Sequence, residues 1–342
     1  MVTVENLEKE LKNGNVSSLY LLYGEELFLL ESALKKIKSL FGASIKGINF
    51  ITIDETNYNE LISDIETPSF VYEKKLIIDR NTGILKKEGK RKNPEMQSLK
   101  ANLSKYIEEN IKIIKSSIVL VFVEEEIDNK QELYKVIEKF GTVCKFDYQK
   151  PIQIAKRIKT ICKQYQVEID DDTITYFIEC CGTNMQDLIN EIRKLIEYVS
   201  ERGKIEKKDI DKLSTKKLES IIFDLTDNLG KKDIAKALEI LQNLIYTKEP
   251  LQKILVTLYN HFKKLYIVTV ATKNNKDIAK SLNLKPNQTF LVNKYKLQTR
   301  YFSKNELRNI LQSLIDLDYN YKNGLIDLQI GLESIFCAKI GK

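Results

Sequence analysis

Short apolar runs alternate with helical patterns along residues 1–148. The strand candidates are compact runs rich in apolar residues: 18–23, 48–53, 75–78 and 117–123. Two stretches repeat apolar residues at helical spacing, 25–40 and 131–140. The run at 117–123 is continuously apolar, which is typical of a strand buried on both faces of a parallel sheet. This alternation predicts an α/β domain with right-handed crossovers.

From Pro151 onward the strand patterns stop and helical stripes take over. Apolar residues at helical spacing predict helices over 154–165 and 185–199. Carboxylates at 170–172 mark the start of another helix, and 206–213 is a short closing helix. The later ones are 234–245, a long helix opened by Pro250, 304–323, and a last helix to about 338. We therefore expect three domains. An α/β domain at 1–148 is followed by a small all-α domain of about three helices at 149–213 and a second all-α domain at 214–342.

Residues 80–100 interrupt the α/β domain with many basic and few apolar side chains. The basic members are Lys86, Lys87, Lys90, Arg91 and Lys92, and Pro94 follows them. The composition predicts a mobile basic loop. Either a solvated loop or a phosphate contact would explain these charges.

The chain carries 55 Lys and Arg against 48 Asp and Glu, a formal net charge of +7. A positive balance favours acidic partners such as nucleic acid, because neutralising phosphates releases counterions. Lysine serving as the ordinary surface cation would explain the same excess. The net charge alone leaves both explanations open.

The five cysteines are odd in number and contain no C-x-x-C pair, so they predict neither a disulfide framework nor a zinc site. Buried thiols in a reducing compartment fit this pattern. Residues 1–11 lack the apolar stretch of an export signal, and no apolar run approaches the roughly 20 residues of a membrane helix. We expect a cytoplasmic protein without membrane association.

Candidate catalytic chemistry is sparse. The one histidine, His261, lies beside Phe262 on or near an apolar stripe, which favours a structural or surface role. No Ser-His-Asp set or Cys/His metal cluster can be assembled. We therefore predict no catalytic residues, no metal and no cofactor.

A phosphate cradle is missing from the place where an α/β nucleotide site would have one. A P-loop needs G-x-x-x-x-G-K-[ST] between a strand and a helix. Here the first strand runs into Gly24, Glu25 and Glu26, whose carboxylates would repel phosphates but suit the positive end of a helix. Three glutamates at 124–126 resemble the acidic end of an ATPase strand, and a solvated turn explains them equally well. Hydrolysis of ATP by this chain is not expected.

Five short motifs occur in an order and spacing that resemble the DNA polymerase III delta subunit family. They are the segments 19–30, 68–78, 126–135, 190–195 and 222–227. The resemblance covers nearly the whole chain. It implies an AAA+-like α/β domain that has lost ATP binding, a helical lid and a helical collar that serves in oligomerisation. It also implies partners: the beta sliding clamp, the tau/gamma and delta-prime subunits, and primed DNA through the assembled complex.

The resemblance also implies roles for particular residues. Phe70, flanked by Ser69 and Val71, would be an apolar wedge that enters the sliding clamp and opens its ring. The family often has a second large apolar residue where Ser69 stands. From its residue type alone Phe70 would be an ordinary buried side chain.

Two further groups of residues follow from the later motifs. Asn190, Glu191, Lys194 and Leu195 form the lid motif, placed where active ATPases carry a nucleotide sensor. In this chain Ile192 and Leu195 are expected to pack the lid. Phe223 and Leu225 are expected to pack the junction between lid and collar.

Two rival functions remain to be weighed. One is an active AAA+ ATPase subunit of the tau/gamma type, against which the missing P-loop and the missing zinc-ligand cysteines count. The other is a stand-alone helical DNA-binding protein, suggested by the basic balance. Micromolar affinity for ATP would favour the first rival. Steeply salt-dependent DNA binding without affinity for a clamp would favour the second.

Overall fold

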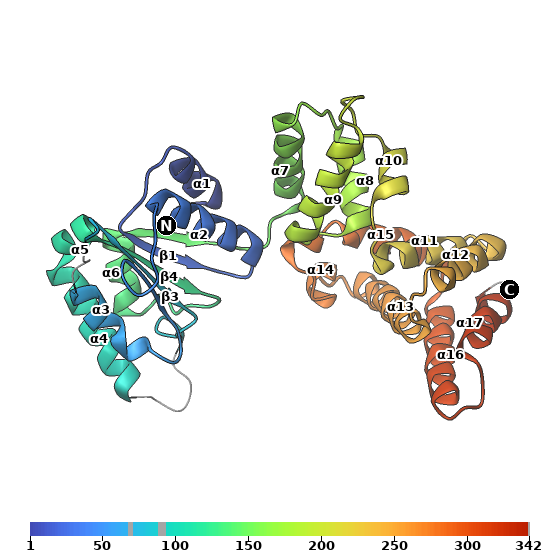
Figure 1. Cartoon of the computed structure of the whole chain (residues 1–342). Helices are drawn as coiled ribbons and strands as arrows, with labels where there is room; N and C mark the ends of the chain where they lie inside the picture. The colour runs from blue at the N-terminus through green and yellow to red at the C-terminus, as the bar shows by residue number, and fades with distance from the viewer. Residues whose placement is uncertain (68–70, 88–93, 341–342) are drawn as a thin grey trace. The chain divides into compact units, whose positions relative to one another are not determined.

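The structure is a computed structural model that describes residues 1–67, 71–87 and 94–340. The chain forms two compact units, Met1–Tyr148 and Gln149–Lys342 (Figure 1). The first unit holds the sheet and the second is helical. The division into three domains, with boundaries after residues 148 and 213, stays a prediction.

The first unit is built on a five-stranded parallel sheet in the order β2-β3-β4-β1-β5. Its strands are β1 (Leu19–Tyr23), β2 (Phe50–Ile53), β3 (Lys75–Arg80), β4 (Ile118–Glu124) and β5 (Thr142–Lys145). In the central register Leu21 pairs with Phe122 on one side and Val143 on the other. Every residue of β1 and β4 is buried. For β4 this confirms the prediction drawn from the continuously apolar run 117–123.

Helices cover both faces of this sheet (Figure 1). They are α1 (Val4–Lys12), α2 (Leu27–Phe41), α3 (Leu61–Glu66), α4 (Pro94–Glu109), α5 (Ile111–Ser117) and α6 (Glu132–Phe140), with a short 3₁₀ turn at Tyr58–Glu60. One buried core joins α1 and α2 to residues such as Leu22 and Val121. A second core joins α3, α4 and α6 to residues such as Leu21 and Phe122. The alternation of side chains along each strand supplies both cores.

The prediction of a basic loop over residues 80–100 is largely wrong. Arg80 ends β3, Ile84 and Leu85 are fully buried, and α4 begins at Pro94. Leu99, Leu103 and Ile107 give α4 an apolar stripe that binds it to the sheet. Between these parts, residues 88–93 lie outside the described residues.

The second unit begins with four helices where about three were expected: α7 (Pro151–Gln164), α8 (Asp171–Cys181), α9 (Met185–Tyr198) and α10 (Lys207–Leu213). Asp170 caps α8 by accepting a hydrogen bond from the Thr173 backbone N–H at 2.7 Å, as its place before the helix predicts. The later elements are α11 (Leu218–Gly230), α12 (Ile234–Tyr246), α13 (Leu251–Lys273), α14 (Ile278–Ser281), α15 (Leu291–Gln298), α16 (Lys304–Lys322) and α17 (Leu328–Ile335), with short turns at Pro286–Gln288, Thr299–Tyr301 and Phe336–Ile340. One continuous apolar core runs from Leu218 to Phe336.

No helix of the described residues is long and apolar enough to cross a membrane. Four of the five cysteines are buried free thiols, as predicted: Cys144, Cys162, Cys180 and Cys181. Cys337 is exposed, which corrects the prediction for that residue.

Candidate functional site

The turn after β1 is closed by its own backbone. Gly24 donates its N–H to the Glu124 carbonyl at 3.2 Å, and Glu26 donates to the Phe146 carbonyl at 2.9 Å. Phe146 in turn donates to the Tyr23 carbonyl at 2.7 Å. These N–H groups are therefore already used in joining the strands, whereas a P-loop turns such groups toward phosphate.

Gly24 itself is required by this close approach. Its φ of +131° is a conformation that other residues rarely adopt. A Cβ at this position would lie 2.3 Å from the carbonyl oxygen of Phe146. The next residue, Glu25, is exposed, and Glu26 is buried at the N-cap of α2. The helix accordingly begins two residues later than predicted, at Leu27.

Two buried carboxyl groups lie at the neighbouring strand ends. Asp79 of β3 and Glu124 of β4 are 0% and 1% exposed. The Thr82 hydroxyl donates to Asp79 Oδ1 at 2.7 Å, and the Gly83 N–H donates to Glu124 Oε1 at 2.8 Å. The second oxygen of each group, Asp79 Oδ2 and Glu124 Oε2, has no hydrogen-bond partner within the described part of the chain.

Burial governs the protonation of this pair. It raises the pKa of Asp79 to about 8, with the nearby Glu124 adding to the shift and the Thr82 hydroxyl opposing it. Burial also raises the pKa of Glu124, against the hydrogen bond from Gly83. Asp79 therefore retains a proton at neutral pH, which leaves the site poor in the ionised carboxylates that bind Mg²⁺. Within residues 1–67, 71–87 and 94–340, no three His, Cys, Asp or Glu side chains gather into a possible metal site.

The sequence interpretation missed Asp79 and was half right for 124–126. Glu125 and Glu126 are exposed, as a solvated turn requires, but Glu124 is buried. The signal was available, because Asp79 directly follows the apolar run 76–78. An acidic residue continuing a buried strand is uncommon enough to mark a special environment.

The expected wedge lies on the loop between α3 and β3. Ser69 and Phe70 fall outside the described residues, so their placement is not tested. Val71 is 85% exposed and has a φ of +74°. A β-branched residue rarely takes that conformation, and so large an exposed fraction is unusual for valine.

A buried lysine fastens the base of this loop. Lys75, the first residue of β3, is 3% exposed and donates from Nζ to the carbonyls of Asp64 at 2.8 Å and Thr67 at 2.9 Å. Those carbonyls belong to the end of α3, where helical partners run out. Burial lowers the pKa of Lys75, with the Asp64 carboxylate opposing the shift.

The lid motif lies on α9. Ile192 and Leu195 are fully buried, so packing accounts for the apolar part of the motif. Glu191 pairs with Lys194 at 2.7 Å and accepts from the Thr215 backbone N–H at 3.1 Å. Asn190 is exposed and accepts from the Gln186 amide at 3.1 Å.

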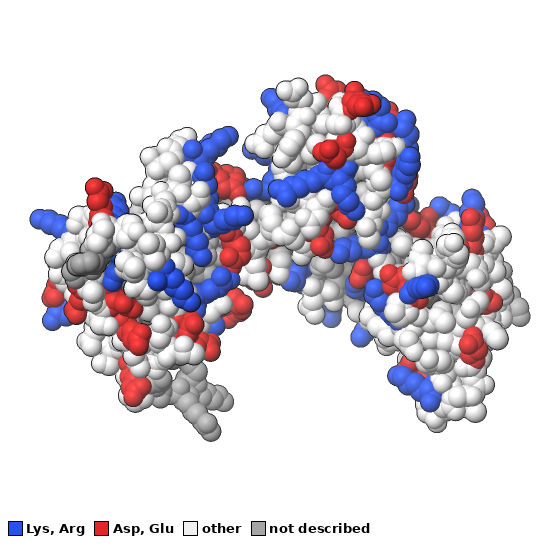
Figure 2. All heavy atoms as spheres, viewed as in Figure 1, with Lys and Arg blue, Asp and Glu red and all other residues white. Residues whose placement is uncertain are grey.

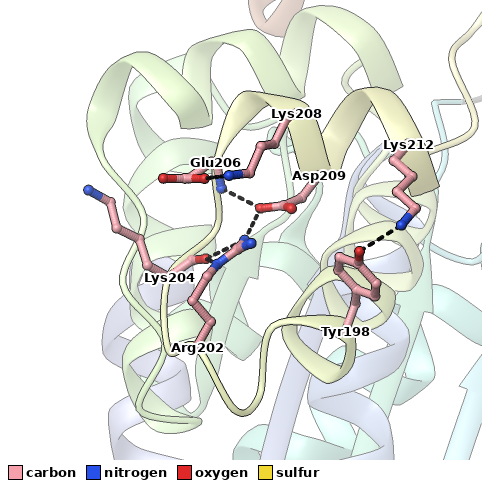
Figure 3. Close-up of polar contacts among 7 residues, drawn as sticks. All are labelled: Tyr198, Arg202, Lys204, Glu206, Lys208, Asp209 and Lys212. Atoms are coloured by element: carbon pink, nitrogen blue, oxygen red, sulfur yellow. Dashed lines mark hydrogen bonds and ion pairs between the residues drawn. The ribbon is translucent and has the colours of Figure 1, made fainter.

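The connection from α9 to α10 is held by a small polar cluster (Figure 3). The Arg202 guanidinium contacts the Asp209 carboxylate and donates to the Lys204 carbonyl at 2.9 Å. Asp209 also accepts from the Glu206 backbone N–H at 2.8 Å. Since Asp209 is 2% exposed, this cluster secures the end of the helix that carries the lid motif.

Phe223 belongs to an aromatic group in the helical core. Its ring lies 4.5 Å from His261 and 4.8 Å from Tyr295, measured between centroids. Gln298 connects the group by donating to the Phe223 carbonyl at 2.8 Å and contacting His261 Nε2 at 2.8 Å. Burial lowers the pKa of His261 to about 4, so this histidine is a neutral structural residue. Leu225, on the same helix, is fully buried.

Comparison with known proteins decides the family. A model described as DNA polymerase III, delta subunit, matches residues 20–147, and a model of the C-terminal domain of that delta subunit matches residues 219–339. The chain belongs to the DNA polymerase III delta subunit family. The two matched ranges fall in the first and second compact units.

Two relatives of this delta family match along most of their length. The DNA polymerase III subunit delta of Bacillus subtilis is 26% identical over 331 residues, which is 95% of this chain and 93% of that protein. The probable DNA polymerase III subunit delta of Aquifex aeolicus is 26% identical over 309 residues, which is 88% of this chain and 85% of that protein. A solved structure, the DNA clamp loader delta protein of Bacillus subtilis, is similar with a TM-score of 0.74 at 24% identity. It covers 99% of this chain and 100% of its own, and it supports the fold.

Proposed function

We propose that this chain is the clamp-loader subunit of a DNA polymerase III, binding the beta sliding clamp and opening its ring. Membership of the delta family over both compact units carries the proposal. The relatives named for the same subunit support its place in a clamp-loader complex. Subunits of the tau/gamma and delta-prime types would be its neighbours there. The chain would reach primed DNA as part of the assembled complex.

Clamp binding is assigned to the loop between α3 and β3. Lys75 ties the base of the loop to the end of α3, while Val71 at the far side is 85% exposed. A fixed base with an exposed apolar tip suits a side chain that must enter a pocket on a partner. Phe70, beside Val71, supplies the aromatic ring, and its burial contributes roughly 1.5–3 kcal/mol.

Opening the ring needs no bond chemistry. A wedge that binds the sprung form of the clamp more tightly than the closed form shifts an existing equilibrium toward the open ring. The chain would act without hydrolysing ATP, because the backbone N–H groups of Gly24 and Glu26 already donate to carbonyls of the protein. ATP would act through the neighbouring subunits.

A binding experiment on the full chain tests this proposal. Immobilised sliding clamp is titrated with wild type, with Phe70→Ala and with Ile113→Ala, a control that removes an apolar side chain 60% exposed on α5. Losing about 1.5 kcal/mol weakens binding about tenfold, so Phe70→Ala is expected to lose at least that much. Ile113→Ala should bind like wild type. Equal binding by a folded Phe70→Ala variant would remove the wedge, and micromolar affinity for ATP would remove the non-hydrolysing role.

A further inference from the structure

Residues 214–217 join α10 to α11, and each of them is fastened to the helices that precede it. We call this segment the connector. Its first residue, Ser214, donates its backbone N–H to the Ile210 carbonyl at 3.0 Å. Its last residue, Lys217, donates its backbone N–H to the Cys180 carbonyl, at the end of α8, at 2.9 Å. Both ends of the connector are therefore bonded to earlier helices.

Two carboxylates of α9 hold the connector as well. Glu191 accepts from the Thr215 backbone N–H at 3.1 Å, and Asp187 pairs with the Lys217 ammonium at 2.7 Å. Residues four apart lie on the same face of a helix, so one face of α9 makes both contacts. The Glu191 side chain is only 13% exposed and also pairs with Lys194 at 2.7 Å. Two members of the lid motif, Glu191 and Lys194, thus serve this contact. We call Asp187 and Glu191 the latch.

The remaining residue of the connector, Lys216, is bound by α10. Its ammonium lies 2.8 Å from the Asp211 carboxylate, which also accepts from the Tyr176 hydroxyl of α8 at 2.6 Å. Figure 2 shows both acidic and basic side chains on the visible face of the second unit, so one ion pair alone is no sign of a special site there. Contacts from α8, α9 and α10 to four successive residues are a stronger observation, because together they fix the path of the connector.

The helices that follow the connector also contact the earlier ones directly. Lys294 of α15 pairs with Glu179 of α8 at 2.8 Å, and both side chains are less than a third exposed. The Lys294 ammonium also lies 5.5 Å from the centre of the Phe223 ring on α11. Asn287, which is 4% exposed, donates to the Thr183 carbonyl between α8 and α9 at 3.5 Å. These contacts lie far from the connector in sequence, so they hold the two groups of helices at additional points.

Such fastening is not the ordinary expectation for two helical bodies joined by a short segment. They move relative to each other unless a large apolar interface holds them. The apolar core that begins at Leu218 is built from α11 and the helices after it, whereas the contacts to α8, α9 and α10 described above are polar. Single exposed ion pairs contribute little to stability, but several charges joined in a network contribute more. The arrangement of these helices therefore depends on a few identifiable polar groups.

We propose that the latch, together with the contacts of Lys294, joins α7–α10 and α11–α17 into one rigid arm. A displacement imposed on α16 would then reach α7 with little loss. Internal movement of the chain is left to the boundary between the two compact units. This role of Asp187 and Glu191 is independent of clamp binding, which is assigned to the first unit.

Distances between spin labels on the full chain test the rigid arm. One pair of labels is attached to Lys156→Cys on α7 and Arg308→Cys on α16, two exposed positions, in a Cys337→Ser background because the other native thiols are buried. A second pair joins Lys36→Cys on α2 to Lys156→Cys and spans the two compact units. Pulsed electron–electron double resonance gives the distribution of each distance. We expect a narrow distribution within the second unit and a broader one across the units.

The test variant carries Asp187→Ala and Glu191→Ala. Its matched control carries Glu197→Ala and Glu201→Ala, which remove the same charge from exposed side chains nearby in sequence. The test variant should broaden the distribution within the second unit, and the control should leave it narrow. Hydrogen exchange at the Thr215 amide, resolved by electron-transfer fragmentation, should become about tenfold faster in the test variant because a hydrogen bond to a carboxylate is lost.

A charge exchange keeps the latch open to refutation even if the alanine variant fails to fold. Asp187→Lys alone should broaden the distribution within the second unit, and Asp187→Lys combined with Lys217→Asp should narrow it again. The rigid arm is overturned if the wild-type distribution within the second unit is no narrower than the one across the units. The latch is overturned if a folded alanine variant matches its control, or if the exchanged pair restores nothing. Clamp binding should stay at the wild-type level in all these variants, so the rigid arm and the clamp-binding role can fail separately.

Discussion

The buried pair formed by Asp79 and Glu124 predicts a specific pH dependence of stability. The substitution Asp79→Asn removes an ionisable group while keeping an oxygen that can accept from the Thr82 hydroxyl. In the folded chain burial raises the pKa of Asp79 to about 8, whereas the unfolded chain has a value near 3.9. Between these two values the folded state holds a proton that the unfolded state releases.

The sign and size of the effect follow from that difference. Because the folded state binds more protons, the free energy of unfolding of wild type falls as pH rises from about 4 to about 8. The contribution of Asp79 reaches at most about 1.4 kcal/mol per pH unit, or roughly 3 kcal/mol between pH 5 and pH 7. An amide cannot ionise, so the Asp79→Asn variant should gain stability relative to wild type over this range. Burial also raises the pKa of Glu124, so the Asp79→Asn variant should keep part of the pH dependence of stability seen in wild type.

Urea unfolding followed by pulsed hydrogen exchange and mass spectrometry provides the assay. It reads peptides from β3 and β4 separately from those of the helical unit, which need not unfold at the same urea concentration. Glu125→Gln serves as the control, because Glu125 is exposed and should leave the pH slope unchanged. If wild type and Asp79→Asn unfold in parallel from pH 5 to pH 7, the argument for a proton held on Asp79 fails.

Three further substitutions test local features of the fold. Gly24→Ala should cost at least about 2 kcal/mol of stability in urea unfolding, because its Cβ would lie 2.3 Å from the Phe146 carbonyl oxygen at a φ of +131°. An unchanged midpoint would contradict that close approach. Lys75→Met should leave two carbonyls at the end of α3 without a donor, cost about 2 kcal/mol, and speed hydrogen exchange in residues 61–67. Unaltered exchange there would show that the lysine does not fasten the loop base. Gln298→Leu should cost about 1–3 kcal/mol by leaving the buried His261 Nε2 without its hydrogen-bond partner, whereas retained thermal stability would rule out that network.

The strands with continuous apolar runs were predictable because burial on both faces leaves no room for polar residues. β4 is the clearest example. β5 could not be recognised in the same way, since Thr142–Lys145 is short, with Thr142 half-buried and Lys145 exposed. Its place depends on pairing with β1, a long-range contact that no local pattern encodes.

The basic stretch at 80–100 misled the interpretation for a different reason. Its charges outnumber its apolar residues, but Ile84 and Leu85 are buried and Pro94 opens a helix. Leu99 and Leu103, spaced by four, carried the helical signal beyond the charged run. Composition averaged over the whole stretch concealed that signal.

The residues around Gly24 were enough to predict that a phosphate-binding loop is missing. They did not reveal what occupies the backbone N–H groups there. Close approach of Phe146 to Gly24 joins strands that are far apart in sequence. The same limit applies to Asp79, whose pKa is raised chiefly by burial and is adjusted by Thr82 and Glu124, which the fold brings beside it. The residue types predicted that phosphate-binding groups are absent. Only the fold shows that contacts between distant strands occupy the backbone groups and bury the carboxyl groups.

Ring opening measured without nucleotide tests the central claim most directly. A sliding clamp labelled with a self-quenching pair of dyes across one interface is mixed with the full chain, and the rise in fluorescence reports opening. The account predicts that the wild-type chain opens the ring in the absence of ATP and that Phe70→Ala does not, while Ile113→Ala behaves as wild type. Opening that requires ATP bound by this chain, or equal opening by Phe70→Ala, would contradict it.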